Sequence, residues 1–284
     1  MKTLFKVLLS LALVWGVARF CHYQTAGFKM SKIANNLEQA PPQAVPIVDM
    51  GPILKQPFTY LGRGFQAFVF ESQDKQYVLK LFTNTYQRRL FWLSLCPFPL
   101  QWKTNKNREY SEKLLKGFHS YQLAFDEFKE ESGLIYVHLN PTSYLQKITI
   151  IDKLGIAHEI DANQMGFLIQ KKATLVYPYL SELLAKGEEQ RAKEAIHALL
   201  DFFVERAKRG IGDTDPLIRT NFGFIGERPI QIDVGPLYKD PLLKESYRTD
   251  IPRIAQSLKH WLEQHSPELA HYLNRELEGL RDEI

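Results

Sequence analysis

The sequence predicts an α+β fold of two lobes, with strands gathered in the first lobe and helices in the second. Between residues 58 and 170, short apolar runs broken by glycines and turn residues are typical of strands, and a single long helical pattern lies among them. After Lys171 and Lys172 the apolar residues recur at helical spacing instead. Strands and helices that are segregated along a chain in this way are typical of the α+β class.

The first thirty residues are predicted to target the chain to a membrane. Lys2 and Lys6 precede an apolar run from Val7 to Ala18, a pattern that suits a signal peptide. Counted from Leu4 to Phe20, the apolar stretch reaches the lower length limit of a spanning helix, and a buried N-terminal helix is the alternative. We expect residues 1–30 to be a signal peptide or a signal anchor. The protein is then membrane-associated or exported, with the side of the membrane left open.

The proline-rich segment Pro41–Pro46 predicts an extended linker over residues 31–47. The folded domain is expected to begin at about Val48, with a strand-rich lobe at 48–170 and a helical lobe at 171–284. The apolar patterns predict strands at 65–70, 77–82, 134–139, 148–152, 157–160 and 166–170, and helices at 107–131, 179–185, 188–209, 254–265 and 269–280.

A glycine-rich turn in the first lobe predicts a contact with phosphate groups. Gly62 and Gly64 lie at the tip of a strand–turn–strand pattern, where the missing side chains let backbone N–H groups approach a polyphosphate. Lys80 stands in the following strand, from which it can reach phosphates held under that turn. Each feature also has a plainer interpretation, because Gly-x-Gly makes ordinary hairpin turns and a strand lysine is usually solvated.

Acidic residues gather downstream of the helix predicted at 188–209. Asp213, Asp215 and Asn221 follow this helix, and an Asp-Val-Gly sequence begins at Asp233 after a short apolar strand. Carboxylate and amide oxygens are the ligands that Mg²⁺ prefers.

This arrangement resembles the protein-kinase-like superfamily, in which a catalytic loop follows a long helix and precedes a metal-binding Asp-Phe-Gly. The resemblance implies that the protein uses ATP and Mg²⁺. By it, Asp215 would orient the accepting hydroxyl and take its proton, and Asn221 and Asp233 would hold Mg²⁺. Lys80 would pair with the α- and β-phosphates beneath the glycine turn.

The sequence also departs from the family pattern. Asp213 and Thr214 stand where the family has His-Arg, and five residues separate Asp215 from Asn221, one more than usual. Asp213 is therefore a rival for the catalytic role. No Ala-Pro-Glu follows Gly235, and 49 residues remain after it. The resemblance thus favours a small atypical, bacterial-type kinase that acts on a small-molecule or a lipid- or sugar-linked hydroxyl.

Other functions stay open at this point. One is a catalytically inactive module, a pseudokinase that binds a nucleotide or a partner at a membrane, and another is an unrelated membrane-anchored α+β protein. The glutamate that should pair with Lys80 is not assigned, because Glu109, Glu112 and Glu127 all lie on the predicted helix. The net charge of +4 and the lack of a basic stripe argue against nucleic acid. Nucleotide and membrane are the expected partners, and a protein partner stays open.

An apolar insert, from Arg88 to Trp102, separates the lysine strand from the long helix. A packed loop is its first interpretation. A membrane contact is the second, since Trp92 and Trp102 lie close to Arg88 and Arg89, the residue types that gather at membrane interfaces. The two cysteines of the chain are unclustered, so neither a disulfide framework nor a zinc site is expected.

Overall fold

The computed structural model describes residues 2–33, 37, 50–97 and 100–282. The chain divides into two compact units. The first consists of Met1–Leu115 and Tyr136–Ile169, and the second of Lys116–Ile135 and Gln170–Ile284. Residues 38–47 of the predicted linker, its prolines included, lie outside the described residues, and the lobe boundary after residue 170 stays a prediction.

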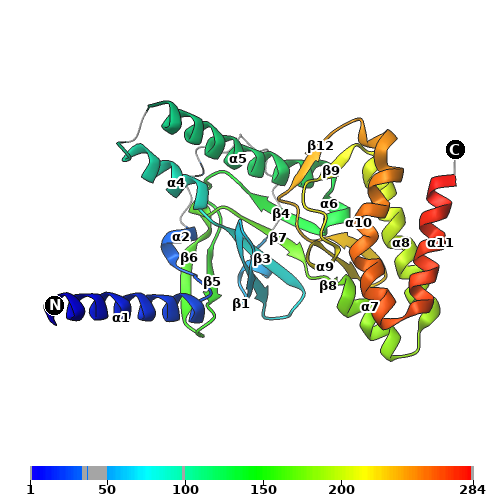
Figure 1. The fold of residues 1–284 in the computed structure, drawn as a ribbon, viewed down its shortest axis with the longest axis horizontal. Helices are drawn as coiled ribbons and strands as arrows, with labels where there is room; N and C mark the ends of the chain where they lie inside the picture. The colour runs from blue at the N-terminus through cyan, green and yellow to red at the C-terminus, as the bar shows by residue number, and fades with distance from the viewer. Residues whose placement is uncertain (1, 34–36, 38–49, 98–99, 283–284) are drawn as a thin grey trace. The chain divides into compact units, whose positions relative to one another are not determined.

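The first unit is built on a seven-stranded sheet in the order β4-β7-β3-β2-β1-β5-β6 (Figure 1). The strands are β1 (Phe58–Arg63), β2 (Ala67–Ser72), β3 (Tyr77–Phe82), β4 (Leu134–His138), β5 (Lys147–Ile151), β6 (Ala157–Asp161) and β7 (Phe167–Lys171). β1, β2 and β3 form an antiparallel meander, whereas β5 joins β1 in parallel and continues into a hairpin with β6. Gly155, at a φ of +81°, lies in the turn between them.

Short helices and one long helix accompany this sheet. They are α1 (Lys2–Gln24), α2 (Met30–Ile33), α3 (Gly51–Leu54), α4 (Thr85–Ser94), the first part of α5 (Leu100–Glu127) and a 3₁₀ turn at Ala162–Gln164. α1 has no buried residue over its apolar window and a mean hydropathy of 1.8, so by length and composition it can cross a membrane. A signal sequence has the same properties.

The segment that follows α1 is fastened to the sheet. Arg63 donates a hydrogen bond from Nη1 to the Ala26 carbonyl at 3.2 Å, and Lys153 donates from Nζ to the Tyr23 carbonyl at 3.4 Å. The Phe28 ring is buried edge-on against Phe68, with ring centroids 5.2 Å apart. The end of the apolar helix is therefore part of the folded unit.

The second unit is mainly helical. Its elements are the end of α5, α6 (Lys129–Ser132), β8 (Thr174–Leu175), α7 (Val176–Ala185), α8 (Glu189–Lys208), β9 (Ile211–Asp213), α9 (Ile218–Asn221), β10 (Phe222–Ile225), β11 (Arg228–Gln231), β12 (Leu237–Lys239), α10 (Leu243–His265) and α11 (Pro267–Asp282). α8 packs against α7, α10 and α11. Its buried residues recur at three- and four-residue spacing, among them Ile196, Leu200 and Phe203, so one stripe of the helix faces the core.

The predicted α+β class, with a strand-rich part followed by a helical part, is confirmed. Two helices begin well before their predicted starts. α5 begins at Leu100 rather than at residue 107, because the Lys103 ammonium donates to the Ser94 carbonyl at 2.9 Å and ties the first turn to the end of α4. α10 begins at Leu243 rather than at residue 254, after a turn in which the Asp240 carboxylate accepts from the Leu242 N–H.

Candidate functional site

The acidic residues predicted from the sequence lie on a chain segment that folds back on itself in the second unit. β9 ends at Asp213, α9 ends at Asn221, and the β10–β11 hairpin leads to Asp233. β9 then pairs with β12, directly after the Asp233 turn, so that Leu237 lies opposite Asp213. Antiparallel pairing thus brings the start and the end of this segment side by side.

Asn221 joins the two halves of the segment. Its side-chain Nδ2 donates to the Asp215 carbonyl at 2.7 Å, and its own carbonyl accepts from the N–H groups of Ile232 at 2.7 Å and Asp233 at 3.4 Å. The amide Oδ1 accepts from the Thr220 hydroxyl at 2.9 Å, which fixes the orientation of the amide. One buried side chain therefore holds the loop that carries Asp215 against the turn that carries Asp233.

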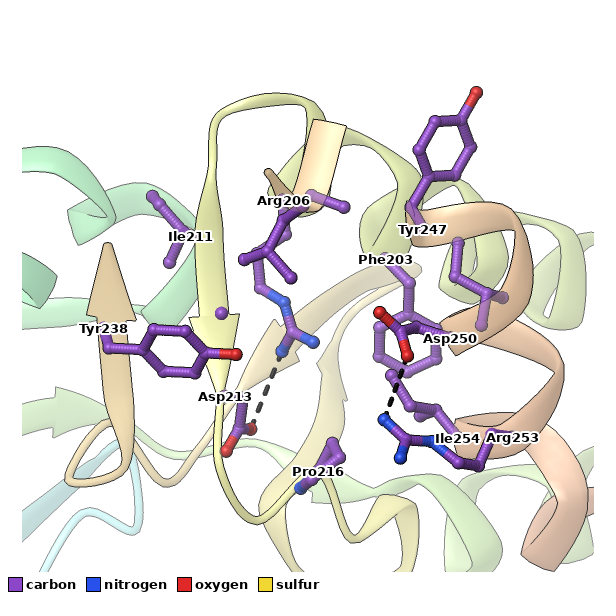
Figure 2. Close-up of a pocket in the computed structure, with 14 residues that line it drawn as sticks. Phe203, Arg206, Ile211, Asp213, Pro216, Tyr238, Tyr247, Asp250, Arg253 and Ile254 are labelled. Atoms are coloured by element: carbon purple, nitrogen blue, oxygen red, sulfur yellow. Dashed lines mark hydrogen bonds and ion pairs between the residues drawn. The ribbon is translucent and has the colours of Figure 1, made fainter. Parts of the chain in front are cut away.

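Asp213 lies in a buried polar cluster with Arg206 and Gln231. Its carboxylate, which is fully buried, accepts from the Asp215 N–H at 2.7 Å and from Gln231 Nε2 at 2.8 Å. Arg206 Nη1 lies 3.6 Å from the same carboxylate and donates to Gln231 Oε1 at 2.7 Å. Gln231 Nε2 also donates to the Asp233 carbonyl at 3.0 Å. The cluster, seen in part in Figure 2, thus connects Asp213 to the backbone of both Asp215 and Asp233.

The surroundings of Asp213 make its carboxyl group harder to ionise than that of an exposed aspartate. Burial raises the pKa of Asp213 to about 6, although the positive charge of Arg206 works in the opposite direction. The nearby carboxylates of Asp233 and Asp215 raise the pKa further. Burial also lowers the pKa of Arg206. Asp213 is therefore a buried group held by its neighbours, and its side chain has no surface exposed to solvent.

Asp215 and Asp233 are exposed, in contrast to Asp213. Asp233 Oδ1 accepts from the Gly235 N–H at 3.0 Å, which fixes the carboxylate over its own turn. In the described part of the chain no three His, Cys, Asp or Glu side chains lie together as a metal cluster. One carboxylate and one amide nevertheless fit Mg²⁺, which is usually bound by one or two protein ligands together with substrate phosphates.

Residues that the sequence did not single out support the Asp233 turn. The Ser120 hydroxyl donates to the Val234 carbonyl at 2.5 Å, and Gln170 Nε2 donates to the Ile232 carbonyl at 3.1 Å. Tyr121 is buried nearby, and its pKa is raised by burial and by the Asp233 charge. Arg206 and Gln231 were also missed. A charged residue on the apolar stripe of α8, such as Arg206, is the signal that could have revealed the buried cluster.

Gly62, Gly64 and Lys80 belong to the first unit, whereas Asp213, Asp215, Asn221 and Asp233 belong to the second. Gly62 follows a bulge in β1, where the pairing with β2 shifts register. A Cβ at Gly62 would meet nothing within 4 Å, and one at Gly64 would have only the Ala67 carbonyl oxygen within that distance, at 3.8 Å. Packing within the chain therefore does not require glycine at Gly62, and the open space fits the close approach of a ligand.

Lys80 lies in β3, opposite Val69 of β2, and is only 9% exposed. This low exposure excludes the plainer interpretation, in which Lys80 is a solvated strand lysine. Buried lysines are rare and need a specific environment. Of the three glutamates considered as its partner, Glu109 is paired with Lys106 and Lys113, and Glu127 with Lys239.

A pocket adjoins the Asp213 cluster within the second unit (Figure 2). Its empty volume is about 450 Å³, counting the space open to solvent, and its walls come from α8, β9, β12 and α10. The Tyr238 ring lies so close over Gly212 that any side chain at this position would collide with it. Glycine is therefore required here by packing, in contrast to Gly62.

No protein-family model and no curated protein matches the chain. Among solved structures, it is similar to WbdD, described as a bifunctional kinase-methyltransferase, at 18% identity over 75% of this chain and 44% of that one, with a TM-score of 0.34. It is also similar to Rv3197 from Mycobacterium tuberculosis, solved with erythromycin, at 15% identity over 70% and 54% of the two chains, with a TM-score of 0.33. The chain spans about half the length of these proteins. Similarity this weak carries no argument about what the chain does.

Proposed function

We propose that the protein is an ATP-dependent phosphotransferase of the protein-kinase-like superfamily, which acts on the hydroxyl of a small molecule or of a lipid- or sugar-linked acceptor. The observation that carries the proposal is the position of Asn221. Its side chain and its carbonyl hold the exposed Asp215 and the exposed Asp233 on one hydrogen-bonded frame. Phosphoryl transfer requires such a frame, because its catalysis is mostly positioning and charge neutralisation.

Within this frame Asp215 is the proposed catalytic base. It would accept the proton of the acceptor hydroxyl while that oxygen bonds to the γ-phosphorus and ADP leaves with the electrons of the broken bond. Asp213, the rival from the sequence, has a buried carboxylate whose oxygens already accept hydrogen bonds from Asp215 and Gln231. We assign Asp213 a positioning role, in which it fixes the backbone of the base.

The remaining roles concern the nucleotide and its metal ion. Asn221 Oδ1 and the Asp233 carboxylate would hold Mg²⁺, which when bound neutralises the charge on the transferred phosphate. Gly62 and Gly64 would offer backbone N–H groups to the phosphates, and the buried Lys80 would pair with them.

We further infer that α1 anchors the protein in a membrane or directs its export. No residue in the apolar window of α1 is buried, so these apolar side chains do not contribute to the core of the first unit. Burial of such a helix in a bilayer is favourable, because each apolar side chain leaves water.

Nucleotide-dependent thermal stabilisation, measured with and without Mg²⁺, tests the proposal. ATP should raise the melting temperature of the wild-type protein, since a ligand that binds the native state stabilises it. D233A should keep its fold and lose the Mg²⁺-dependent part of this shift, whereas E245Q, which removes an exposed carboxylate from the first turn of α10, serves as the matched control. A folded D233A protein with unchanged Mg²⁺ dependence would refute the role of Asp233.

ATP turnover then separates the two aspartates. D215N should abolish turnover while nucleotide binding persists, and D213N should lower it only through the altered loop. If D215N retains wild-type turnover while D213N loses it with binding intact, the assignment of the base is wrong. If the wild-type protein binds Mg²⁺-ATP without turnover for any acceptor, the inactive binding module becomes the better description.

A further inference from the structure

α4 and the first turn of α5 expose an apolar surface. We call it the α4 patch and define it as Phe91, Trp92, Leu95 and Trp102, whose exposed fractions are 59%, 63%, 62% and 47%. Leu93 is the only residue of α4 that is buried. The insert from Arg88 to Trp102 is therefore not a packed loop, since its largest described side chains face solvent. An exposed apolar cluster of this kind marks an interaction surface.

The α4 patch is held in one arrangement. Lys103 of α5 donates from Nζ to the carbonyls of Ser94 at 2.9 Å and Cys96 at 3.4 Å, which ties the two helices together at their adjoining ends. The rings of Phe91 and Trp92 meet edge-to-face, with centroids 5.7 Å apart. The two aromatic side chains of α4 thus pack on each other, and the helix that carries Trp102 is tied to the end of α4.

The sequence around the patch has an excess of positive charge, although Lys106 is paired with Glu109, which directly follows the segment counted here. From Thr85 to Arg108 the sequence contains five Lys and Arg and no Asp or Glu. The whole chain carries a net charge of only +4, so this segment contributes more than the entire excess. Arg88 and Arg89 are exposed beside the aromatic residues, and Arg89 lies over the rings of Tyr86 and Tyr110 at 5.8 and 5.5 Å. Cations next to tryptophans suit an anionic bilayer surface.

The N-terminus of α4 is bound to the segment that follows α1. The backbone N–H of Asn84 donates to the Lys32 carbonyl at 2.8 Å, and its side-chain Nδ2 donates to the Ser31 carbonyl at 2.8 Å. α2, which contains both acceptors, starts six residues after the end of α1. α4 therefore begins beside the point at which the apolar helix leaves the folded unit.

From these observations we propose that the α4 patch is a second membrane contact, which lies in the headgroup layer of an anionic bilayer. Phe91, Trp92, Leu95 and Trp102 would enter the interface, and Arg88 and Arg89 would bind anionic headgroups. This contact goes beyond the proposed phosphotransferase activity. It would hold the first unit against the membrane surface, where a lipid-linked acceptor would be presented to it.

A full-length variant without a functional α1 tests this contact by itself. In L8E/L11E, two side chains that are 56% and 61% exposed become charged, which removes the apolar span without touching the core. We expect this protein to sediment with phosphatidylcholine–phosphatidylglycerol vesicles and to bind much more weakly to phosphatidylcholine alone. High salt should release it, because the Debye length shortens.

Two further pairs of substitutions identify the surface. R88Q/R89Q in the same background should weaken partition by about 30-fold, which corresponds to about 2 kcal/mol for the loss of two cations near an anionic surface. W92A/W102A should weaken it on both kinds of vesicle. L242A/K244Q is the matched control, because it removes an exposed leucine and an exposed lysine from the second unit, and its binding should not change.

The anchored protein provides a second measurement. In W15F/W261F only Trp92 and Trp102 fluoresce, and brominated lipids in the bilayer should quench them. Absence of quenching, or a lack of vesicle binding by L8E/L11E, would overturn the proposal. Self-association that W92A/W102A abolishes, without any binding to vesicles, would identify the patch as a protein interface instead. ATP-dependent thermal shifts in the same samples separate these outcomes from a failure of the phosphotransferase proposal.

Discussion

Replacement of Asp213 by asparagine should change how the stability of the protein depends on pH. The Asp213 carboxyl has an ordinary pKa of 3.8, which burial raises to about 6 in the folded protein. A raised folded-state pKa means that the folded protein binds the proton more tightly than the unfolded chain. Its contribution to stability is therefore fully present below pH 3.8 and is lost as the pH rises through about 6.

The magnitude follows from the difference between the two pKa values. A shift of one pKa unit corresponds to about 1.4 kcal/mol, so ionisation of Asp213 in the folded protein costs about 3 kcal/mol in all. Between pH 7 and pH 5 the wild-type protein should recover about 1 kcal/mol of this cost. The asparagine side chain of D213N cannot titrate, so the destabilisation caused by this substitution should grow by about that amount on acidification.

The destabilisation caused by R206M should change with pH in the opposite direction to that caused by D213N. It leaves the buried Asp213 carboxylate without its cation, and breaking a buried pair typically costs about 3–5 kcal/mol. Loss of the Arg206 charge also raises the pKa of Asp213 further, because that charge opposes the effect of burial. The cost of R206M should therefore shrink as the pH falls from 7 to 5, while the cost of D213N grows.

Urea unfolding at pH 5, 6 and 7, followed by near-ultraviolet circular dichroism, measures both trends. The L8E/L11E background keeps the protein free of detergent, and E245Q serves as a control that removes an exposed carboxylate from outside the cluster. Differences from wild type that are constant across this pH range for both D213N and R206M would refute the buried, proton-binding cluster. A carbon-13 titration of the Asp213 carboxyl with a midpoint near pH 4 would refute it as well.

Three further outcomes are expected. G62A should leave the melting temperature nearly unchanged, because the added Cβ meets nothing within 4 Å, yet it should weaken ATP binding in a calorimetric titration; unchanged affinity would contradict the phosphate contact. F203A should lower the free energy of unfolding by about 3–5 kcal/mol, because the buried Phe203 ring packs edge-to-face on Phe222 at 5.1 Å; a loss below about 1 kcal/mol in denaturant unfolding would contradict its place in the core. L8E/L11E should move the protein from the membrane to the soluble fraction, or from the exported to the retained pool, and an unchanged distribution would exclude targeting by α1.

Local patterns predicted the elements of the fold well. β3 spans the residues predicted for it, and β5, β6 and β7 begin within one residue of their predicted starts. Apart from the short apolar strand expected before Asp233, which is β11, the strands β8 to β12 were not predicted, because two to four residues carry too little periodicity to be recognised. Some of them depend on partners distant in sequence for their hydrogen bonds, as β9 does where Ile211 lies opposite Lys239.

In the predicted site, too, some features follow from the sequence and others only from the folded structure. The order of Asp213, Asp215, Asn221 and Asp233 along the chain is a sequence property, and it was sufficient to predict a loop that could bind a metal ion. Nothing in that order distinguishes the two aspartates, because spacing along the chain does not report burial. The fully buried Asp213 carboxylate and the exposed Asp215 differ through their surroundings in the folded chain.

The sequence by itself determined the α+β class, the apolar N-terminal helix and the residue types available for phosphate and metal binding, because periodicity and composition are local. Only the tertiary structure decided that Arg206, Asp213 and Gln231 form one buried cluster. It also decided that the aromatic side chains of α4 face outward. Both results depend on which surfaces the folded chain leaves in contact with water, and that is fixed by the packing of segments that are far apart in the sequence.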